Sequence, residues 1–374
     1  IRPNAYSIWE KIQEYFNKVL EKRKIPNAYF PLFIPESFFK KEAEHAQGFK
    51  PEVAWIANKD EGEERLAIRP TSETVIYDAY ANWIRSYQDL PLRMNQWANV
   101  VRWETKATRL FLRTREFLWQ EGHCVYETKE QTDEETLLVL QEYKILCEEI
   151  LAIPVLVGKK TESEKFAGAL YTTSIEGFMP DGKGLQMGTS HNLGQGFAKA
   201  FGIKFFGKDE LEHYPWQNSW CVSTRLLGAL IMTHGDDKGM VIPPNVAYHK
   251  IVIVPIGFEK NKEILKQVKA LEKKLQMYNP LVDVRTDKSP GWKFNEWELV
   301  GIPLRIEIGP KDLEKNQVTL VRRDTGIKTA VKTTEVSKKV EETLDLIKEN
   351  LFTKAKKQLE DNTVQVKDKK ELLH

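Results

Sequence analysis

The chain has 374 residues, of which 56 are basic and 54 acidic, so its formal net charge is only +2. This balance excludes a histone-like polycation and confines any nucleic-acid surface to a local patch, while the length indicates more than one domain. Three scattered cysteines, Cys124, Cys147 and Cys221, exclude a disulfide framework or a paired-cysteine zinc site and favour a reducing compartment, for which we expect the cytoplasm. No apolar run of about 18 residues and no leader-like start is present, so we expect neither a membrane span nor a signal peptide.

The first elements in chain order are two helices and a strand. Apolar residues recur at helical spacing over residues 9–20 and 76–87, and the second of these helices is entered through residues 70–73. Residues 29–35 are apolar and bounded by prolines, which predicts a strand. An edge strand that ends at its prolines is the plainer interpretation of the same residues.

A charged hairpin follows. In a predicted strand over residues 95–104, period-2 alternation directs Arg102 and Glu104 to one face. A polar loop turns the chain, and Arg113 and Arg115 enter the next strand. Because arginine offers two parallel donors that match phosphate oxygens, the hairpin suits an anionic ligand such as a nucleoside triphosphate. A salt-bridged hairpin on a solvated sheet face is the alternative.

Two further helix starts are predicted in the middle of the chain. One lies near Thr132, where the spacing to Glu135 is that of a capping box. The other follows a strand over residues 218–223 and opens at Thr224 and Arg225. Backbone donors and the helix dipole favour anions at such an end, although an ordinary capping threonine beside a solvated arginine would look the same.

After residue 244 the pattern changes to an alternation of strands and helices. Such alternation within about 100 residues predicts a separate mixed α/β domain. Strands are expected at residues 250–257, 281–286, 302–308 and 317–323, and helices at 264–275 and 336–351. We therefore expect a domain over residues 1–247, a second over 248–352, and a charged linker or tail over 353–374 that leads to a further domain outside this chain.

Six ordered segments resemble the class II aminoacyl-tRNA synthetases, in the form found in prolyl-tRNA synthetases of the eukaryotic and archaeal type. RWE, a loop and FLRTREFLWQEGH (residues 102–123) resemble motif 2, NAYFPLFIP (27–35) motif 1, RPTSET (69–74) the amino-acid loop, GTSHNLGQGFAKAF (188–201) the segment beneath the prolyl pocket, residues 218–244 motif 3 and residues 289–312 the anticodon-binding domain. The resemblance implies an α+β fold with an antiparallel-sheet catalytic domain and a smaller mixed α/β anticodon-binding domain.

The resemblance also implies a reaction and its residues. A homodimer would activate L-proline with ATP and Mg²⁺ to prolyl-adenylate and transfer the prolyl group to proline tRNA, with Arg102 and Arg225 acting in catalysis. ATP would contact Arg102, Glu104, Arg113, Thr114, Phe117, Gln186, Thr189, Thr224 and Arg225, with Gln186 near the magnesium ion. Proline would contact Thr71, Glu73, Arg102, Trp119, His123, Phe166 and His191. The anticodon would contact Glu298, Arg305, Lys311 and Asp312, and Pro31 would lie at the dimer interface.

Several alternatives stay open at this point. Phe117 could be a core aromatic, His191 a satisfied core histidine, and Lys311 with Asp312 a charged turn. For the whole chain, an inactive synthetase-like RNA-binding or regulatory protein and a relative specific for threonine, serine or glycine are the rivals. A nucleotide-binding protein of another fold would need a glycine-rich phosphate loop, which the sequence lacks. No Cys/His cluster follows Pro310, so no zinc site is expected in this chain.

Overall fold

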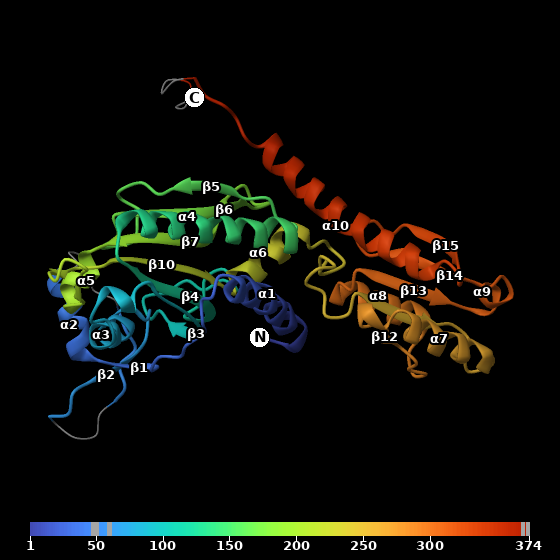
Figure 1. The fold of residues 1–374 in the computed structure, drawn as a ribbon. Coiled ribbons are helices and arrows are strands. Elements are labelled where there is room, and N and C mark those ends of the chain that lie inside the picture. The colour runs from blue at the N-terminus through green and yellow to red at the C-terminus, as the bar shows by residue number, and fades with distance from the viewer. Residues whose placement is uncertain (46–51, 58–61, 368–370, 372–374) are drawn as a thin grey trace.

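Two sheet-containing units lie side by side in the computed structural model, which describes residues 1–45, 52–57, 62–367 and 371 (Figure 1). The first unit is built on a six-stranded antiparallel sheet and the second on a five-stranded mixed sheet, which confirms the predicted fold class. The first sheet has the order β3 (Leu92–Val101), β4 (Glu116–Tyr126), β10 (Trp216–Ser223), β7 (Gly184–Gly194), β6 (Tyr171–Phe178) and β5 (Leu156–Lys159).

Two helices cover one face of the six-stranded sheet. They are α1 (Pro3–Lys22), which confirms the predicted amphipathic first helix, and α4 (Lys129–Ile145). Phe16 of α1 stacks on Tyr143 of α4 at 5.3 Å between ring centroids and meets Trp220 of β10 edge-on at 6.2 Å. These buried rings join both helices to the sheet in one core.

The opposite face is covered only in part. Helices α3 (Glu73–Trp83) and α5 (Gly196–Phe201) pack near one end of it, where Tyr77 contacts both His123 and Phe197. The remainder of this face is open and carries the cavities described below. The shorter elements of the unit are β1 (Phe33–Pro35), β2 (Leu66–Ile68), β8 (Phe205–Phe206), β9 (Glu212–His213), α2 (Glu36–His45), η1 (Tyr87–Asp89) and η2 (Leu146–Ile150).

The strand predicted over residues 29–35 is shorter than expected. Only Phe33–Pro35 forms a strand, which pairs with β2. The backbone groups of Phe30 are bonded to side chains instead, since its N–H donates to Gln96 Oε1 at 2.5 Å and its carbonyl accepts from Arg69 at 2.8 Å. These side chains satisfy the buried backbone without a neighbouring strand.

The hairpin prediction was wrong in its boundaries. Strand β3 ends at Val101 and β4 begins at Glu116, so the four charged residues predicted on strands all lie in the loop between them. The chain turns because the N–H of Arg102 makes a last bond to the carbonyl of Arg115, at 2.7 Å, and the Arg102 carbonyl then accepts from Thr105 at 3.3 Å. Arg102 and Glu104 therefore do not share a strand face.

The capping box predicted at Thr132 lies one turn earlier. Thr128 Oγ1 accepts from the N–H of Gln131 at 3.3 Å, and Gln131 Oε1 accepts from the N–H of Thr128 at 3.2 Å. Thr132 and Glu135 are buried inside the helix. Glutamine completes a capping box as glutamate does, and this pair explains where α4 begins.

The second unit has the sheet order β12 (Leu281–Val282), β11 (Ile251–Pro255), β13 (Leu304–Ile308), β14 (Gln317–Arg322) and β15 (Lys328–Lys332). Both central strands, β11 and β13, are buried along their whole length, as expected for strands covered on two faces. Helices α7 (Lys262–Lys274) and α10 (Val336–Asp361) contribute to the core on one face, and α8 (Pro290–Val300) covers the other.

Four elements of this unit escaped prediction: α8, β15, the short helix α9 (Pro310–Glu314) and the 3-10 helix η3 (Gln276–Tyr278). The predicted strand over residues 281–286 shrinks to Leu281–Val282. The predicted tail begins later, because α10 continues to Asp361 with Ala355 still buried. Within the described residues, no helix is both long and apolar enough to cross a bilayer.

Candidate active site

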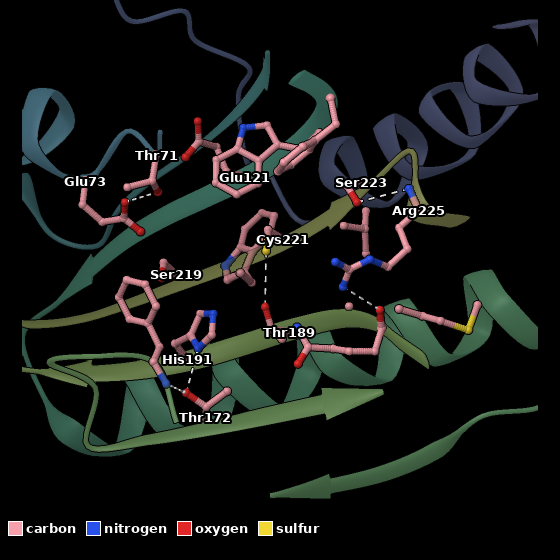
Figure 2. Close-up of a pocket in the computed structure, with 18 of the residues that line it drawn as sticks. Thr71, Glu73, Glu121, Thr172, Thr189, His191, Ser219, Cys221, Ser223 and Arg225 are labelled. Atoms are coloured by element: carbon pink, nitrogen blue, oxygen red, sulfur yellow. Dashed lines mark hydrogen bonds between the residues drawn. The ribbon is translucent and has the colours of Figure 1, made fainter. Parts of the chain in front are cut away.

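Alternation along β4 builds one wall of the site. Phe117, Trp119, Glu121 and His123 face away from α1 and α4 and line a cavity of about 220 Å³. The register of the neighbouring strands aligns further side chains in rows: His123, Ser219 and His191 form one row, and Glu121, Cys221 and Thr189 the next. Figure 2 shows Thr71 and Glu73 at one end of this cavity and Arg225 at the other.

A second cavity, of about 340 Å³, adjoins the first on the side of the β3–β4 loop. Both cavities are lined by Arg102, Phe117, Ser223 and Arg225. Glu104, Arg113 and Thr114 line only the second cavity. The site is therefore one elongated space with Arg102 at the junction of its two halves.

The first half ends in buried acidic groups. Thr71 Oγ1 donates to Glu73 Oε2, and both residues are more than nine-tenths buried. Glu121 Oε1 accepts from Ser72 Oγ at 2.5 Å and from Gln96 Nε2 at 2.8 Å. Two carboxylates close together at the dry end of a cavity favour a cationic ligand group.

His123 is bonded on both ring nitrogens. Nε2 lies 3.0 Å from Glu121 Oε2, and Nδ1 lies 3.1 Å from the hydroxyl of Tyr77. Burial opposes the charged imidazole, but the bond to Glu121 and its negative charge raise the pKa of His123 overall. For Glu121, burial is outweighed by its bonds to His123, Ser72 and Gln96, so the pKa of that carboxyl is lowered.

His191 has the opposite electrostatics. Its Nδ1 lies 2.9 Å from the hydroxyl of Thr172, and its ring faces Phe166 at 4.9 Å between centroids. Burial, with the charges of His123 and Arg102, lowers the pKa of His191 to about 3, so this imidazole is neutral. The residue is buried and hydrogen-bonded, and it also lines the cavity, so both interpretations made from the sequence describe part of its environment.

The second half is rich in unpaired cations. The guanidinium of Arg102 lies 5.4 Å from the ring centroid of Phe117 and 5.7 Å from that of Trp119. Arg225 donates from Nε to the Leu112 carbonyl at 3.0 Å and from Nη1 to the Gln186 carbonyl at 3.1 Å. Burial first, and then the charges of Arg102 and Arg113, lower the pKa of Arg225.

Within the described part of the chain, none of these three arginines pairs with a carboxylate. Their mutual repulsion would be relieved by a bound anion. The half of the site around Arg102, Arg113 and Arg225 is thus arranged for phosphate or carboxylate oxygens.

The start of α6 (Arg225–His234) agrees with the prediction made from the sequence. Strand β10 ends at Ser223 and the helix begins at Arg225. The N–H of Arg225 donates to Ser223 Oγ at 3.2 Å, while Thr224 occupies the capping position without a side-chain bond. The serine hydroxyl, rather than the threonine, satisfies this helix end.

The other residues predicted to contact the nucleotide differ in whether their side chains are already hydrogen-bonded. Thr189 Oγ1 lies 3.2 Å from Cys221 Sγ on the cavity floor, as Figure 2 shows. Thr114 Oγ1 already donates to the Glu116 carbonyl at 2.6 Å. Gln186 lines the first cavity with its side chain, and Glu104 is exposed in the loop.

The predicted anticodon residues lie in the second unit, apart from this site. Arg305 is buried and donates to Glu298 Oε1 and Glu307 Oε1, both at 3.0 Å, with its guanidinium 4.2 Å from the ring centroid of Phe294. Asp312 Oδ2 accepts from the N–H of Gly309 at 3.0 Å and so caps α9. Lys311 is exposed in the first turn of the same helix.

The lining residues that the sequence did not predict include Glu121, Thr172, Ser219 and Cys221. Glu121 could have been found, because it lies between the predicted Trp119 and His123 on the same strand face. The others became visible only with the strand register. Ser219 Oγ and Trp119 Nε1 are buried and have no hydrogen-bond partner among the described residues, and both residues line the cavity.

Comparisons with known proteins agree with this geometry. Residues 50–234 match the tRNA synthetase class II core domain (G, H, P, S and T), and residues 250–343 match an anticodon binding domain. The chain is 54% identical over 367 residues to the proline–tRNA ligase of Natranaerobius thermophilus, covering 97% of this chain and 76% of that protein. Proline–tRNA ligases of Chlorobaculum tepidum and Clostridium botulinum strain 657 are 52% and 51% identical over 370 and 365 residues, which cover 98% and 97% of this chain and 77% and 76% of those proteins.

Proposed function

The chain belongs to the proline–tRNA ligases of the class II aminoacyl-tRNA synthetases, and from this premise we propose how its residues divide the reaction. The enzyme activates L-proline with ATP and transfers the prolyl group to proline tRNA. Activation joins the proline carboxylate to the α-phosphorus of ATP and releases pyrophosphate. Two anions must therefore be held together against their repulsion.

Arg102 carries this proposal, because it lines both cavities and pairs with no carboxylate among the described residues. Proline would bind in the first half, with its ammonium toward Glu73 and Thr71 and its carboxylate toward Arg102. Trp119, His123, Phe166 and His191 would surround the ring.

ATP would occupy the second half. Its phosphates would contact Arg102, Arg113 and Arg225, and its adenine would lie against Phe117, with Glu104 accepting from the amino group. Thr114, Thr189 and Thr224 would contribute further nucleotide contacts. Because the attacking carboxylate is already ionised, the step needs no general base. The three arginines would stabilise the negative charge of the transition state.

A magnesium ion bound with ATP would neutralise phosphate charge. The amide oxygen of Gln186 is a hard donor of the type Mg²⁺ accepts, and the side chain lines the cavity. One protein ligand is enough for an ion whose other ligands are phosphates and water. The main-chain carbonyl of Gln186 would also orient Arg225, whose Nη1 donates to it at 3.1 Å.

The wider assignments are part of the same proposal. We assign residues 1–247 to catalysis and residues 248–352 to anticodon binding, through Glu298, Arg305, Lys311 and Asp312. One hydrophobic core lies within residues 1–247, and a second lies within residues 251–351 except for Ala152 and Val241, which supports this division. A homodimer with Pro31 at its interface and a cytoplasmic location complete it, and the three free thiols suit a reducing compartment.

The test is the substitution Arg102→Ala. Losing an electrostatic donor of this kind costs on the order of a hundredfold or more in rate. We expect proline-dependent ATP–pyrophosphate exchange to fall by at least that factor, with the melting temperature unchanged. Arg109→Ala is the matched control, since Arg109 belongs to the same loop but pairs with Asp181 at 3.7 Å and lines neither cavity. Exchange within threefold of the parent in Arg102→Ala would contradict the assignment.

A further inference from the structure

A polar joint connects the end of α6 with the second unit. Arg323 follows β14 and has only 3% of its side chain exposed. Its Nη1 and Nη2 donate to the two carboxylate oxygens of Asp236 at 2.8 and 2.6 Å, and its Nε donates to the carbonyl of Glu298 at 2.8 Å. One guanidinium therefore holds both the segment after α6 and the end of α8.

The backbones at this joint are in direct contact. The N–H of Met240 donates to the Leu299 carbonyl at 3.1 Å, and the N–H of Ile242 donates to the Gly301 carbonyl at 3.2 Å. A Cβ on Gly239, whose φ is +129°, would lie 2.5 Å from the Leu299 carbonyl oxygen. A side chain there would push the two segments apart, so movement of one is transmitted to the other.

The joint ends at functional groups on both sides. In the catalytic unit, α6 begins with Arg225 and ends at His234, whose Nε2 lies 2.9 Å from the Leu151 carbonyl. In the other unit, Glu298 accepts from Arg305 at 3.0 Å and lies 3.8 Å from Lys238 of the joint. A base that bonds to Glu298 or Arg305 must compete with the ion pair between them, so the pair would have one arrangement without the base and another with it.

We propose that Asp236 and Arg323 are positioning residues that couple anticodon binding to the ATP-site arginine at the start of α6. The inference rests on the proposed function. A change of partner at Glu298 shifts the backbone that Arg323 holds, and Asp236 passes the shift to α6 and Arg225. Coupling of this kind requires an element with two arrangements that both sites bias, and the Glu298–Arg305 pair is that element.

The experiment compares three activities in Asp236→Asn and Arg323→Gln: proline-dependent exchange, charging of intact proline tRNA, and charging of an acceptor minihelix without an anticodon. We expect kcat/KM for intact tRNA to fall by about tenfold, within the usual range of coupling between sites, while exchange and minihelix charging stay within twofold. The double variant should lose no more than Arg323→Gln alone, since both changes break the pair between Asp236 and Arg323.

Lys348→Ala is the matched control. Lys348 Nζ also joins the two units, through Glu149 Oε2 at 2.7 Å, but the pair lies on the surface and has no bond to Glu298. This variant should charge intact tRNA as the parent does. Parental charging of intact tRNA by both joint variants, or an equal loss in all three activities with a lowered melting temperature, would overturn the coupling. Absence of proline exchange in the parent enzyme would instead overturn the proposed function.

Discussion

At the scale of single residues, the two imidazoles of the site share a cavity but titrate in opposite directions. The pKa of His123 is raised above its ordinary 6.5 by Glu121, whereas burial lowers that of His191 to about 3. At pH 6.5 we therefore expect His123 to be mostly protonated and His191 neutral. Nuclear magnetic resonance titration of the ring nitrogens in the range pH 5 to 8 should show His123 losing its proton and His191 neutral throughout.

The variant Glu121→Gln is the control for this prediction. Without the carboxylate, the lowering effect of burial is opposed only by the charge of Glu73, so the pKa of His123 should fall. The raised pKa also makes the folding stability depend on pH. The stability that protonated His123 contributes is fully present below pH 6.5 and is lost as the pH rises through the raised pKa of His123. An unchanged titration of His123 in Glu121→Gln would show that this carboxylate does not set it.

The sequence predicted many of the residues that line the site, including Thr189 on its floor, but it did not predict Glu121, Ser219 or Cys221. Arg102, Arg225 and Glu73 could be predicted because their motifs are local in the chain. Ser219 and Cys221 are small residues in a strand, and only the register with β4 and β7 shows that they lie beside His123 and Glu121. Pairing across a sheet depends on segments far apart in sequence, which a local pattern does not contain.

At the scale of elements, the start of α4 offers a direct test of the capping box. Thr128→Ala removes the acceptor for the N–H of Gln131 and should lower the free energy of unfolding by about 1 kcal/mol. Thr128→Ser keeps the hydroxyl and should cost much less. Urea unfolding followed by circular dichroism measures both, and equal stability of Thr128→Ala and the parent would exclude a stabilising cap.

Helix α8 was not predicted because its inward-facing position carries a charge. Helix α8 has the right start and end, with Ser289 accepting from the N–H of Trp292 and Gly301 in a left-handed conformation. Its buried position, however, is Lys293, whose Nζ donates to the Asp283 carbonyl at 3.2 Å. A lysine on the buried face of the helix interrupts the apolar periodicity from which helices are predicted.

At the scale of the whole molecule, motif 1 predicts the oligomeric state. Tyr29 and Phe33, on either side of Pro31, have 69% and 49% of their surface exposed. Large exposed apolar side chains beside a predicted two-fold contact indicate a partner surface. We expect a homodimer at micromolar concentration by light scattering, and monomers for the double variant Tyr29→Asp, Phe33→Asp.

The control for the dimer is Leu211→Asp. Leu211 is 61% exposed and belongs to a surface loop before β9, outside motif 1. Leu211→Asp should leave the dimer mass measured by light scattering unchanged. A parent chain that is monomeric and fully active would contradict the prediction.

Substitutions at the predicted anticodon residues should affect tRNA charging and leave proline activation unchanged. Glu298→Ala and Lys311→Ala should weaken charging of proline tRNA but spare proline-dependent exchange, since both residues lie outside the site of activation. Carboxylates accept from the amino and imino groups of guanine, and lysine donates to its O6 and N7. Equal losses in both assays would assign these residues to the fold, and normal charging in both variants would remove them from anticodon reading.

Strand β4 has a consequence for how this enzyme tolerates sequence change. Its odd-numbered side chains from Phe117 to His123 line the site, while Gln120 and Cys124 are buried on the opposite face. Even Gly122 is constrained, because a Cβ there would lie 2.1 Å from the ring of Trp220. Almost every position of the strand is therefore constrained in sequence. A single-residue insertion would turn the side chains that line the site toward the core, and the core side chains toward the site. Strand β5, exposed at every residue, is where variation between natural relatives can accumulate without cost.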